Sequence, residues 1–198
     1  MRLRPGDPVP ARELDAVNGP PVPLPDPGRL VHLQFRRFAG CPVCNLHLRS
    51  VAARHAEIEA AGVAEVVVFH SPAGELREHA AGLPFPAVAD PDRRLYREFG
   101  VESSPRALRD PRAWPVIARA VLVGTWRILL RRERPPARSP HGGRLGLPGD
   151  FLIAPDGRIV AARYGEHAGD QWTVDELLSL AARAGRDAVG RDTAGRVP

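Results

Sequence analysis

The stretch LVHLQFRRFAGCPVCNLHLRSV, residues 30–51, decides the fold of this chain. Residues 30–35 alternate apolar and polar side chains, which is the pattern of a β-strand. Gly40 then breaks the strand, and Pro42 stands in the first turn of a helix, where its missing N–H costs nothing. Apolar side chains recur from there at helical intervals through Ile58. The stretch therefore predicts a strand that runs directly into a helix.

The two cysteines of the chain, Cys41 and Cys44, lie at this predicted junction. A helix N-terminus carries partial positive charge and unpaired N–H groups, and both stabilise a thiolate. Cys44 follows one turn later, so that its sulfur can reach back and form an intramolecular disulfide. The spacing supplies an attacking thiol and a resolving thiol, with Pro42 fixing the turn between them. Arg36 and Arg37 lie upstream and would further favour a thiolate if either points inward.

The cysteine count excludes several classes of protein. Two cysteines are too few for a disulfide-stabilised scaffold or for a structural zinc site of four cysteines. A c-type haem needs histidine after the second cysteine, where Asn45 stands. Two alternatives stay open for the pair: burial as small apolar side chains, or metal binding together with His47, His55 or His70. We favour a redox dithiol that needs no metal or other cofactor, because C-x-x-C after a strand is typical of redox sites and no second C-x-x-C is present.

The basic composition says little about partners. The chain of 198 residues has a net charge of +5 and a pI of about 10.4, but all 28 cationic side chains are arginines. Arginine does not deprotonate in proteins, so an all-arginine composition produces a high pI by itself. The charges are spread along the chain rather than gathered in one block. We therefore expect no nucleic-acid partner.

The rest of the chain alternates strand and helix patterns. Strand patterns occupy residues 63–69, 85–89, 151–153 and 158–164, the last two joined by a Pro-Asp-Gly turn as in a β-hairpin. Helix patterns occupy residues 71–81, with Ser71 as the expected N-cap, and 90–99; a capping box at residues 173–176 begins the last helix. This order predicts an α/β sandwich with a mixed central sheet flanked by helices.

The strands and helices form one predicted domain, residues 29–184. The first 28 residues contain eight prolines and predict an extended lead-in. Residues 185–198 are rich in Gly, Asp and Arg and predict a flexible tail.

Residues 103–146 interrupt the pattern, and we expect an insertion that carries one amphipathic helix. Its apolar run, residues 114–130, contains Arg119 and Arg127 and is too short and too charged for an ordinary membrane span. The expected role of this helix is packing over an exposed part of the sheet, and a homodimer contact or a membrane-surface contact is the alternative. Because the start of the chain also lacks an apolar secretory segment, we expect a cytoplasmic protein without membrane contact.

The segment order resembles the thioredoxin fold, and more narrowly the peroxiredoxin-like branch of the AhpC/TSA redoxin superfamily. The similarity is carried by FRRFAGCPVCNLHLRS, VVVFHS, LPFPAVADPDRRLYREFGV and HGGRLGLPGDFLIAPDGRIVAARYGEHAGDQWTVDELL, which together cover about residues 30–180 around the insertion. The pieces GCPVCN, FHS and YGEHAGDQW are similar to bacterial redox proteins of the selenoprotein-L-like group, in which selenocysteines can replace the two cysteines.

The resemblance implies a role for each residue of the site. Cys41 matches the nucleophilic position and Cys44 the resolving position. Pro148, in Leu-Pro-Gly-Asp before the hairpin, resembles the cis-proline that flanks the dithiol in thioredoxin-like sites. The implied reactants are a disulfide or peroxide substrate and a thiol that donates electrons.

Three positions depart from the peroxiredoxin pattern. Typical peroxiredoxins have Thr three residues before the peroxidatic cysteine and Pro seven residues before it, where this chain has Phe38 and Gln34. The family arginine before the hairpin strand corresponds to Pro148. Arg163 and the two upstream arginines are the residues left to polarise a peroxide.

The sequence therefore predicts a thiol–disulfide oxidoreductase with a peroxiredoxin-like antioxidant role, in which Cys41 attacks and Cys44 resolves. Peroxide reduction through a sulfenic acid on Cys41 is the alternative within the enzyme class. A non-catalytic module that binds a partner through the helix of residues 114–130 is the alternative from another class.

Overall fold

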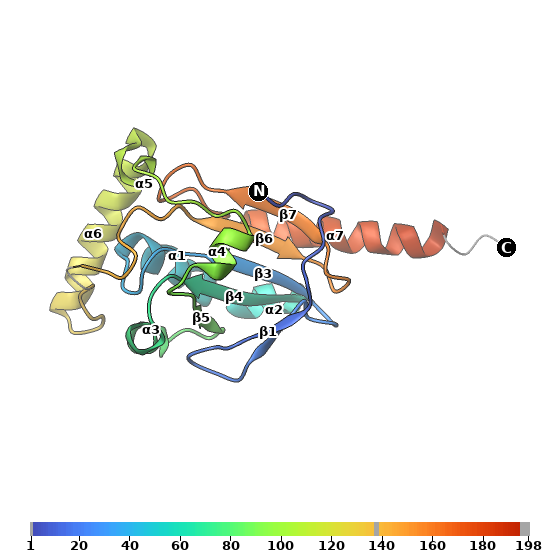
Figure 1. The fold of residues 1–198 in the computed structure, drawn as a ribbon, viewed down its shortest axis with the longest axis horizontal. Coiled ribbons are helices and arrows are strands. Elements are labelled where there is room, and N and C mark those ends of the chain that lie inside the picture. Colours follow the sequence, from blue (N-terminus) through green and yellow to red (C-terminus); the bar gives the residue numbers. More distant parts are fainter. Residues whose placement is uncertain (1, 137–138, 195–198) are drawn as a thin grey trace.

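The centre of the fold is strand β3 (Leu30–Phe35) in the computed structural model, which describes residues 2–136 and 139–194. β3 pairs in parallel with β4 (Val63–Phe69) and antiparallel with β6 (Gly149–Ile153). The edge strands are β5 (Ala87–Ala89) and β7 (Ile159–Tyr164), so that the order is β5-β4-β3-β6-β7 (Figure 1). The mixed sheet predicted from the sequence is confirmed, including the β6–β7 hairpin.

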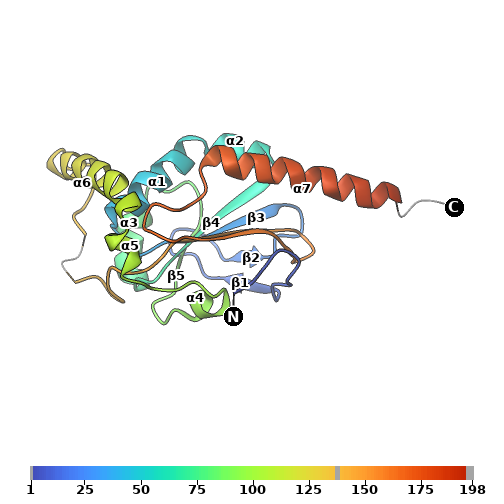
Figure 2. The ribbon, with the colours of Figure 1, turned by 90° about the horizontal axis from the view of Figure 1, so that it is seen from above.

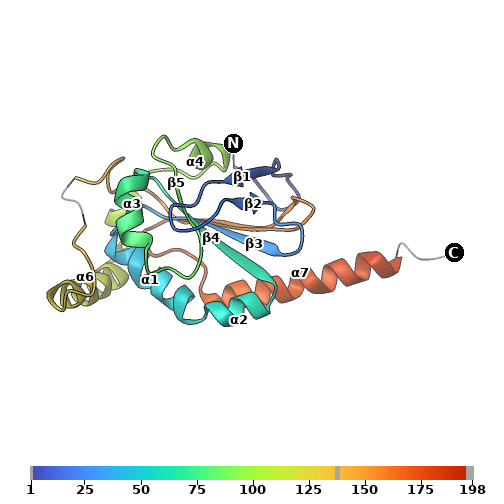
Figure 3. The ribbon, with the colours of Figure 1, turned by 90° about the horizontal axis from the view of Figure 1, so that it is seen from below.

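Helices cover one face of this sheet. Figures 2 and 3 show α1 (Pro42–Ala53), α2 (His55–Ala60) and α7 (Val174–Ala194) on one side. The opposite side carries α4 (Arg94–Glu98) and the small hairpin of β1 (Arg12–Leu14) and β2 (Val22–Leu24). Because side chains alternate along a strand, β4 supplies apolar side chains to both faces, and two separate cores result. The helix-covered face is the one that holds the site.

Two helix starts differ from the prediction. α3 (Ala73–Ala80) begins after Pro72, and Ser71 does not cap it. The Ser71 hydroxyl instead accepts a hydrogen bond from the N–H of Ala39 at 2.9 Å, which ties the loop before Cys41 to the end of β4. The predicted helix of residues 90–99 is shortened to α4, because the Asp90 carboxylate accepts the first N–H groups of that helix.

The insertion packs on a helix rather than over the sheet, so the expected position of its main helix is wrong. It contains α5 (Arg106–Arg109), a short 3-10 helix (Pro111–Ala113) and α6 (Trp114–Leu129). α6 lies against α1 at one end of the molecule, because α1 already covers the sheet there (Figures 1 and 2). No helix in the described ranges is long and apolar enough to cross a membrane.

Both ends of the chain are more ordered than the composition suggests. Residues 12–24 of the proline-rich start form the β1–β2 hairpin, and the N–H of Val9 bonds to the carbonyl of Gly157 at 2.8 Å. The capping box is confirmed by hydrogen bonds between Thr173 and Glu176. α7 continues to Ala194 and so includes most of the segment 185–198 that we expected to be a tail; its last four residues lie outside the described ranges.

Candidate dithiol active site

The dithiol lies where the sequence predicts it, between β3 and α1. Cys41 is the N-cap of α1, and its sulfur accepts the N–H of Cys44 at 3.4 Å. Pro42 occupies the first turn, where it removes an N–H that has no helical partner. Both thiols are free and buried, with Cys41 fully inaccessible. A reactant therefore reaches the sulfurs only after side chains around them move.

Only one of the two upstream arginines contacts the dithiol. The Arg37 Nη2 lies 3.0 Å from the Cys41 sulfur, while its Nη1 donates to the carbonyl of Arg144 at 3.3 Å. Arg37 is itself buried and also lies over the ring of Phe38. Arg36 points to the opposite side, as successive side chains of an extended backbone do, and contacts Asp150. Arg37 is thus the cation that faces the thiols.

The two thiols share one favourable negative charge. Burial opposes ionisation of Cys44, but a hydrogen bond with the Cys41 thiol and the positive charge of Arg37 outweigh it and lower the pKa of Cys44 to about 6. Burial and the adjacent negative charge on Cys44 raise the pKa of Cys41 well above its ordinary value. Because the groups interact strongly, one proton leaves the pair near neutral pH and the other stays between the sulfurs. The dithiol is therefore a thiolate–thiol pair stabilised by Arg37.

A fully buried polar cluster lies beneath α1, on the same helix-covered face of the sheet as the dithiol. We call it the Arg36–Asp150 cluster. The Arg36 Nη2 contacts the Asp150 carboxylate at 2.6 Å and the Gln34 side-chain oxygen at 2.6 Å. His32 joins it through a 3.3 Å contact with Asp150 and a 2.9 Å contact with Glu65. Its members come from β3, β4 and β6, so that it ties the three central strands together.

Charge balance in the Arg36–Asp150 cluster requires a protonated histidine. Its two carboxylates, Glu65 and Asp150, face one arginine and His32. Burial disfavours the charge on His32, but these carboxylates outweigh it and raise the pKa of His32 to about 9. Arg36 and His32 in turn hold the pKa of Asp150 well below its usual range despite burial. With His32 protonated, the cluster has two charges of each sign.

This balance predicts a loss of stability at alkaline pH. A group whose pKa rises on folding stabilises the native state fully below its unfolded pKa, 6.5 for histidine, and this contribution disappears as the pH passes the folded value of about 9. The free energy of unfolding of a Cys41→Ser/Cys44→Ser variant, which lacks the thiol contribution, is expected to fall across this window in urea titrations. Titration of the His32 ring by NMR is the independent check. A midpoint near 6.5 would contradict the assignment.

His47 does not form a metal site with the cysteines. It lies one turn after Cys44 on α1, but its Nε2 faces the Arg36 Nη2 at 3.1 Å. Removal from water and the positive charge of Arg36 lower the pKa of His47 to about 3, so the ring is neutral. His70 and His55 make separate contacts, with the carbonyl of His141 and with Glu59. In the described ranges, no three His, Cys, Asp or Glu side chains gather as metal ligands would.

Pro148 borders the site through its neighbours. It precedes β6, and its carbonyl accepts the N–H of Gly165 at 2.9 Å. The Leu147–Pro148 peptide bond is trans, whereas Leu24–Pro25 is the one cis bond in the described ranges. Gly146, just upstream, lies so close to Arg37 that a Cβ there would be 3.3 Å from the Arg37 Cγ. The chain before β6 thus runs beside Arg37, and a direct role for Pro148 stays a prediction.

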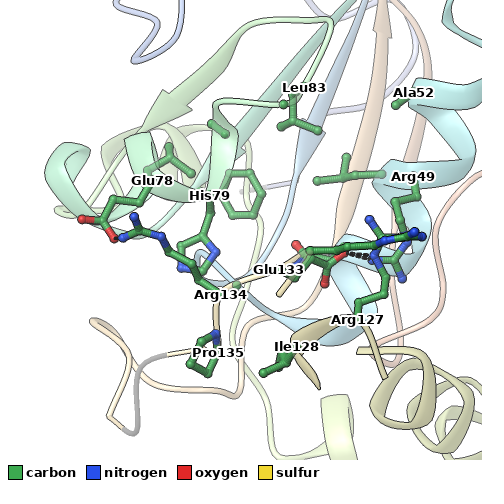
Figure 4. Close-up of a pocket in the computed structure, with 18 of the residues that line it drawn as sticks. Arg49, Ala52, Glu78, His79, Leu83, Arg127, Ile128, Glu133, Arg134 and Pro135 are labelled. Carbon is green, nitrogen blue, oxygen red and sulfur yellow. Dashed lines mark hydrogen bonds and ion pairs between the residues drawn. The ribbon is translucent and has the colours of Figure 1, made fainter. Parts of the chain in front are cut away.

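A pocket of about 650 Å³ opens on the other side of the Cys41 loop (Figure 4). α1, α3 and the C-terminal end of α6 form its walls, and Gly40, next to Cys41, lines it. Its interior is apolar and includes Leu48 and Phe69. Its rim is cationic, with these members: Arg49, Arg127, Arg131, Arg132 and Arg134 against Glu78 and Glu133.

One buried nitrogen atom of the rim has no hydrogen-bond partner among the described residues. Glu133 accepts from both Arg49 and Arg127, and Arg134 pairs with Glu78 (Figure 4). The Arg49 Nη2 is buried and has no hydrogen-bond partner among the described residues. An oxygen atom of an anionic molecule would satisfy it. The pocket therefore favours an organic anion with an apolar part.

A comparison with known families assigns the chain to one of them. The sequence matches the AhpC/TSA family over residues 5–162, most of the chain and all of the region that holds the dithiol and the Arg36–Asp150 cluster. The chain belongs to the AhpC/TSA family. No curated protein sequence matches it. Membership of this family supports a thiol-dependent redox role.

Solved structures confirm the thioredoxin-like fold. The peroxidoxin BcpB of Mycobacterium tuberculosis is similar with a TM-score of 0.63 and 17% identity, over 92% of this chain and 98% of that one. A cysteine-to-serine mutant of the peroxiredoxin 6 of Arenicola marina is similar with a TM-score of 0.65 and 18% identity, over 94% of this chain and 75% of that one. A putative thiol:disulfide interchange protein DsbE from Chlorobium tepidum is similar with a TM-score of 0.57 and 20% identity, over 90% of this chain and 99% of that one. At these identities the likeness concerns the fold alone.

The sequence predicts the position of the dithiol but not the buried Arg36–Asp150 cluster. Cys41, Cys44, Pro42 and Arg37 come together as expected, and Arg36 belongs to a different set of contacts. The members that the sequence analysis did not select are His32, Gln34, Glu65 and Asp150. A polar residue at every second position of β3 was the available signal, and it was interpreted only as evidence for a strand.

Proposed function

We propose that the protein is a thiol–disulfide oxidoreductase in which Cys41 attacks the substrate and Cys44 resolves the intermediate. The observation that carries the proposal is the 3.0 Å contact between the Arg37 guanidinium and the Cys41 sulfur at the start of α1. Arg37 and the N–H of Cys44 both stabilise negative charge on that sulfur. Cys44 lies deeper in the helix, so its sulfur is placed to attack second.

The proposed reaction transfers two electrons from the dithiol to a disulfide. In the form of the thiolate–thiol pair whose remaining proton lies on Cys44, the Cys41 thiolate attacks one sulfur of the substrate, a new S–S bond forms, and the other substrate sulfur leaves as a thiolate. Cys44 then loses its proton to the leaving thiolate or to water and attacks the Cys41 sulfur, which expels the second substrate thiolate. The Cys41–Cys44 disulfide that remains is reduced by an external thiol donor. None of these steps needs a metal, a flavin or a nucleotide.

Peroxide reduction is the second candidate, and family membership favours it. In that reaction the Cys41 thiolate takes one peroxide oxygen and becomes a sulfenic acid, the other oxygen leaves as alcohol or water, and Cys44 displaces hydroxide to form the disulfide. Phe38 and Gln34 stand where peroxiredoxins have Thr and Pro. The side-chain oxygen of Gln34 already accepts a hydrogen bond from Arg36 in the buried cluster. Arg37 is left as the one cation beside the sulfur among the described residues, and for this reason we rank the disulfide reaction first.

Two narrower parts of the sequence interpretation belong to this proposal. The GCPVCN segment and the absence of the usual peroxiredoxin residues favour placement near the selenoprotein-L-like group. We also keep the cytoplasm as the expected location, because that compartment keeps thiols reduced and so would supply Cys41 and Cys44 with electrons. A non-catalytic binding module is the remaining alternative, and the burial of both thiols favours it.

Oxidation with a small disulfide is expected to remove two hydrogens from the wild-type protein and to leave both cysteines unreactive to alkylation. The reason is that the spacing of the two thiols, one helical turn, allows a disulfide. Mass spectrometry of the oxidised and re-reduced protein is the measurement. The Cys41→Ser and Cys44→Ser variants are the controls, and neither should show the loss. Wild-type thiols that resist both oxidant and alkylating agent in the folded protein would favour the binding module instead.

The cationic pocket beside Gly40 predicts a preference for anionic disulfides. An Arg49→Gln variant is expected to reduce dithiobis(nitrobenzoate), which carries carboxylates, about fivefold more slowly than wild type, an effect of the size of one partly exposed ion pair. Its rate with neutral dithiodipyridine should stay unchanged. Stopped-flow absorbance measures both, and Arg94→Gln, an exposed arginine outside the pocket, is the matched control. Equal slowing with both disulfides would show that the pocket does not select for charge.

A further inference from the structure

The outward face of α6 is apolar, which is unusual for a surface helix. Its side chains are exposed by 61% at Trp114, 73% at Leu122, 64% at Trp126 and 71% at Leu129. Val121 adds a further 50%-exposed side chain to the same face. In an ordinary surface helix the outward side chains are polar and the large apolar ones are buried. Here five large apolar side chains point outward, whereas Val116 and Ile117 pack partly buried against the core.

The inward face of α6 accounts for this reversal. Ala120 and Gly124 are the fully buried positions, and a Cβ at Gly124 would lie 3.7 Å from the Cβ of Pro42. Small residues at these points let α6 approach α1 closely. The large exposed side chains are consequently left on the outer side. α6 itself lies at one end of the molecule (Figures 1 and 3). Packing within the chain therefore does not explain two tryptophans and three large aliphatic side chains on that side.

The charges around this face have one sign. α6 contains no Asp or Glu, and Arg119 is exposed on it. Exposed arginines flank its ends, with Arg106 and Arg109 before it and Arg131 and Arg132 after it. The nearest acidic side chains are already engaged by arginines: Asp110 and Glu166 with Arg112, Glu133 with Arg127 and Arg49. The surface is an apolar strip bordered by arginines.

A second copy of the chain fits this surface poorly. An antiparallel two-fold contact would bring Arg131 and Arg132 of one copy beside Arg106 and Arg109 of the other, and a parallel one would bring each arginine beside its own equivalent. This repulsion between like charges favours a different occupant.

We propose that α6 binds the surface of a membrane that contains anionic phospholipids, with the helix lying in the plane of the interface. An apolar face with Trp and Leu, bordered by cations, is the pattern of interfacial helices. The leucine and valine side chains enter the acyl boundary, Trp114 and Trp126 lie at the headgroup level, and the arginines pair with phosphate groups. The proposal is independent of the dithiol chemistry, because it rests on α6 and its flanking arginines alone.

Vesicle sedimentation tests the proposal with the full chain. The wild-type protein is expected to pellet with vesicles of equimolar phosphatidylglycerol and phosphatidylcholine, to bind pure phosphatidylcholine at least about tenfold more weakly, and to be released by salt. Quenching of tryptophan fluorescence by brominated acyl chains should accompany binding. Equal binding to both kinds of vesicle, or none to the anionic kind, would overturn the proposal.

Three variants separate the apolar and the charged contributions. Leu122→Ser/Trp126→Ser removes exposed side chains only, so it should fold normally and lose at least about tenfold in vesicle affinity. Arg131→Gln/Arg132→Gln should weaken binding to the anionic vesicles alone. Leu145→Ser, which removes a 42%-exposed apolar side chain elsewhere, is the matched control and should bind as wild type does. If the wild type ignores vesicles but sediments as a dimer that the Leu122→Ser/Trp126→Ser variant abolishes, the occupant is a second copy and the proposal is wrong.

Discussion

Replacing Arg37 with methionine is expected to raise the lower pKa of the dithiol from about 6 by about 1–3 pH units, because an opposite charge in contact with an ionised group shifts its pKa by that amount. Arg37 is the one cation among the described residues in hydrogen-bond contact with the Cys41 sulfur, and methionine keeps most of its volume without the charge. The pH profile of alkylation by iodoacetamide, together with the ultraviolet absorbance of the thiolate, measures the shift.

The alkylation rate of the Arg37→Met variant should differ from that of wild type in opposite directions at neutral and at high pH. At neutral pH it should react several-fold more slowly than wild type, since less thiolate is present. Above its new pKa it should react faster, because the intrinsic nucleophilicity of a thiolate rises with its pKa. Arg163→Met is the matched control, since Arg163 is bonded to Glu176 and should leave the profile unchanged. A variant whose profile superimposes on that of wild type would remove Arg37 from the site.

Replacing Arg36 with methionine is expected to lower the free energy of unfolding by about 3–5 kcal/mol, the usual result of leaving one member of a buried ion pair alone. Asp150 is completely buried, and Arg36 supplies its 2.6 Å contact. Urea denaturation followed by circular dichroism measures the loss. If the Arg36→Met variant fails to fold, the free energy of unfolding of the Arg36→Met/Asp150→Leu variant is measured instead.

The Arg36→Met/Asp150→Leu variant removes both charges and is expected to recover most of that stability. His32 and Glu65 then remain as a balanced pair. The lower pKa of the dithiol should rise less than in Arg37→Met, because the charge of Arg36 adds only a smaller stabilisation of the Cys44 thiolate, whereas Arg37, which contacts the Cys41 sulfur, is unchanged. A double variant that is as unstable as Arg36→Met would show that shape, rather than charge pairing, holds the cluster together.

Arg36 and Arg37 are thus adjacent in the sequence but have different functions: Arg36 stabilises the buried cluster, and Arg37 stabilises the thiolate. The order of strand, glycine, cysteine and proline is local, and it predicted the dithiol position and the start of α1. The faces of Arg36 and Arg37 depend on how the sheet is covered, which no local pattern shows. The extended backbone points the two side chains in opposite directions, but only the packing of β6 and α1 decides that Arg36 meets Asp150 and Arg37 meets the Cys41 sulfur.

Long-range pairing explains most of what the sequence could not predict. The Arg36–Asp150 cluster joins β3, β4 and β6, whose members are separated by as many as 118 residues. Ser71 has the residue type and position of an N-cap, yet a tertiary contact with the N–H of Ala39 takes its hydroxyl. The placement of α6 on α1 depends on the small residues Ala120 and Gly124, which periodicity marks only as part of an amphipathic helix. Hairpin and capping-box signals are local, and both are confirmed.

The most direct test of the central claim is to identify the cysteine that forms the mixed disulfide. A Cys44→Ser protein treated with excess dithiobis(nitrobenzoate) should accumulate a stable adduct on Cys41, since the contact with Arg37 activates that sulfur and no resolving thiol remains. Peptide mass spectrometry locates the adduct, and its rate of formation should match the first step in wild type. A Cys41→Ser protein that forms an adduct on Cys44 at the wild-type rate would contradict the claim that Cys41 is the attacking residue.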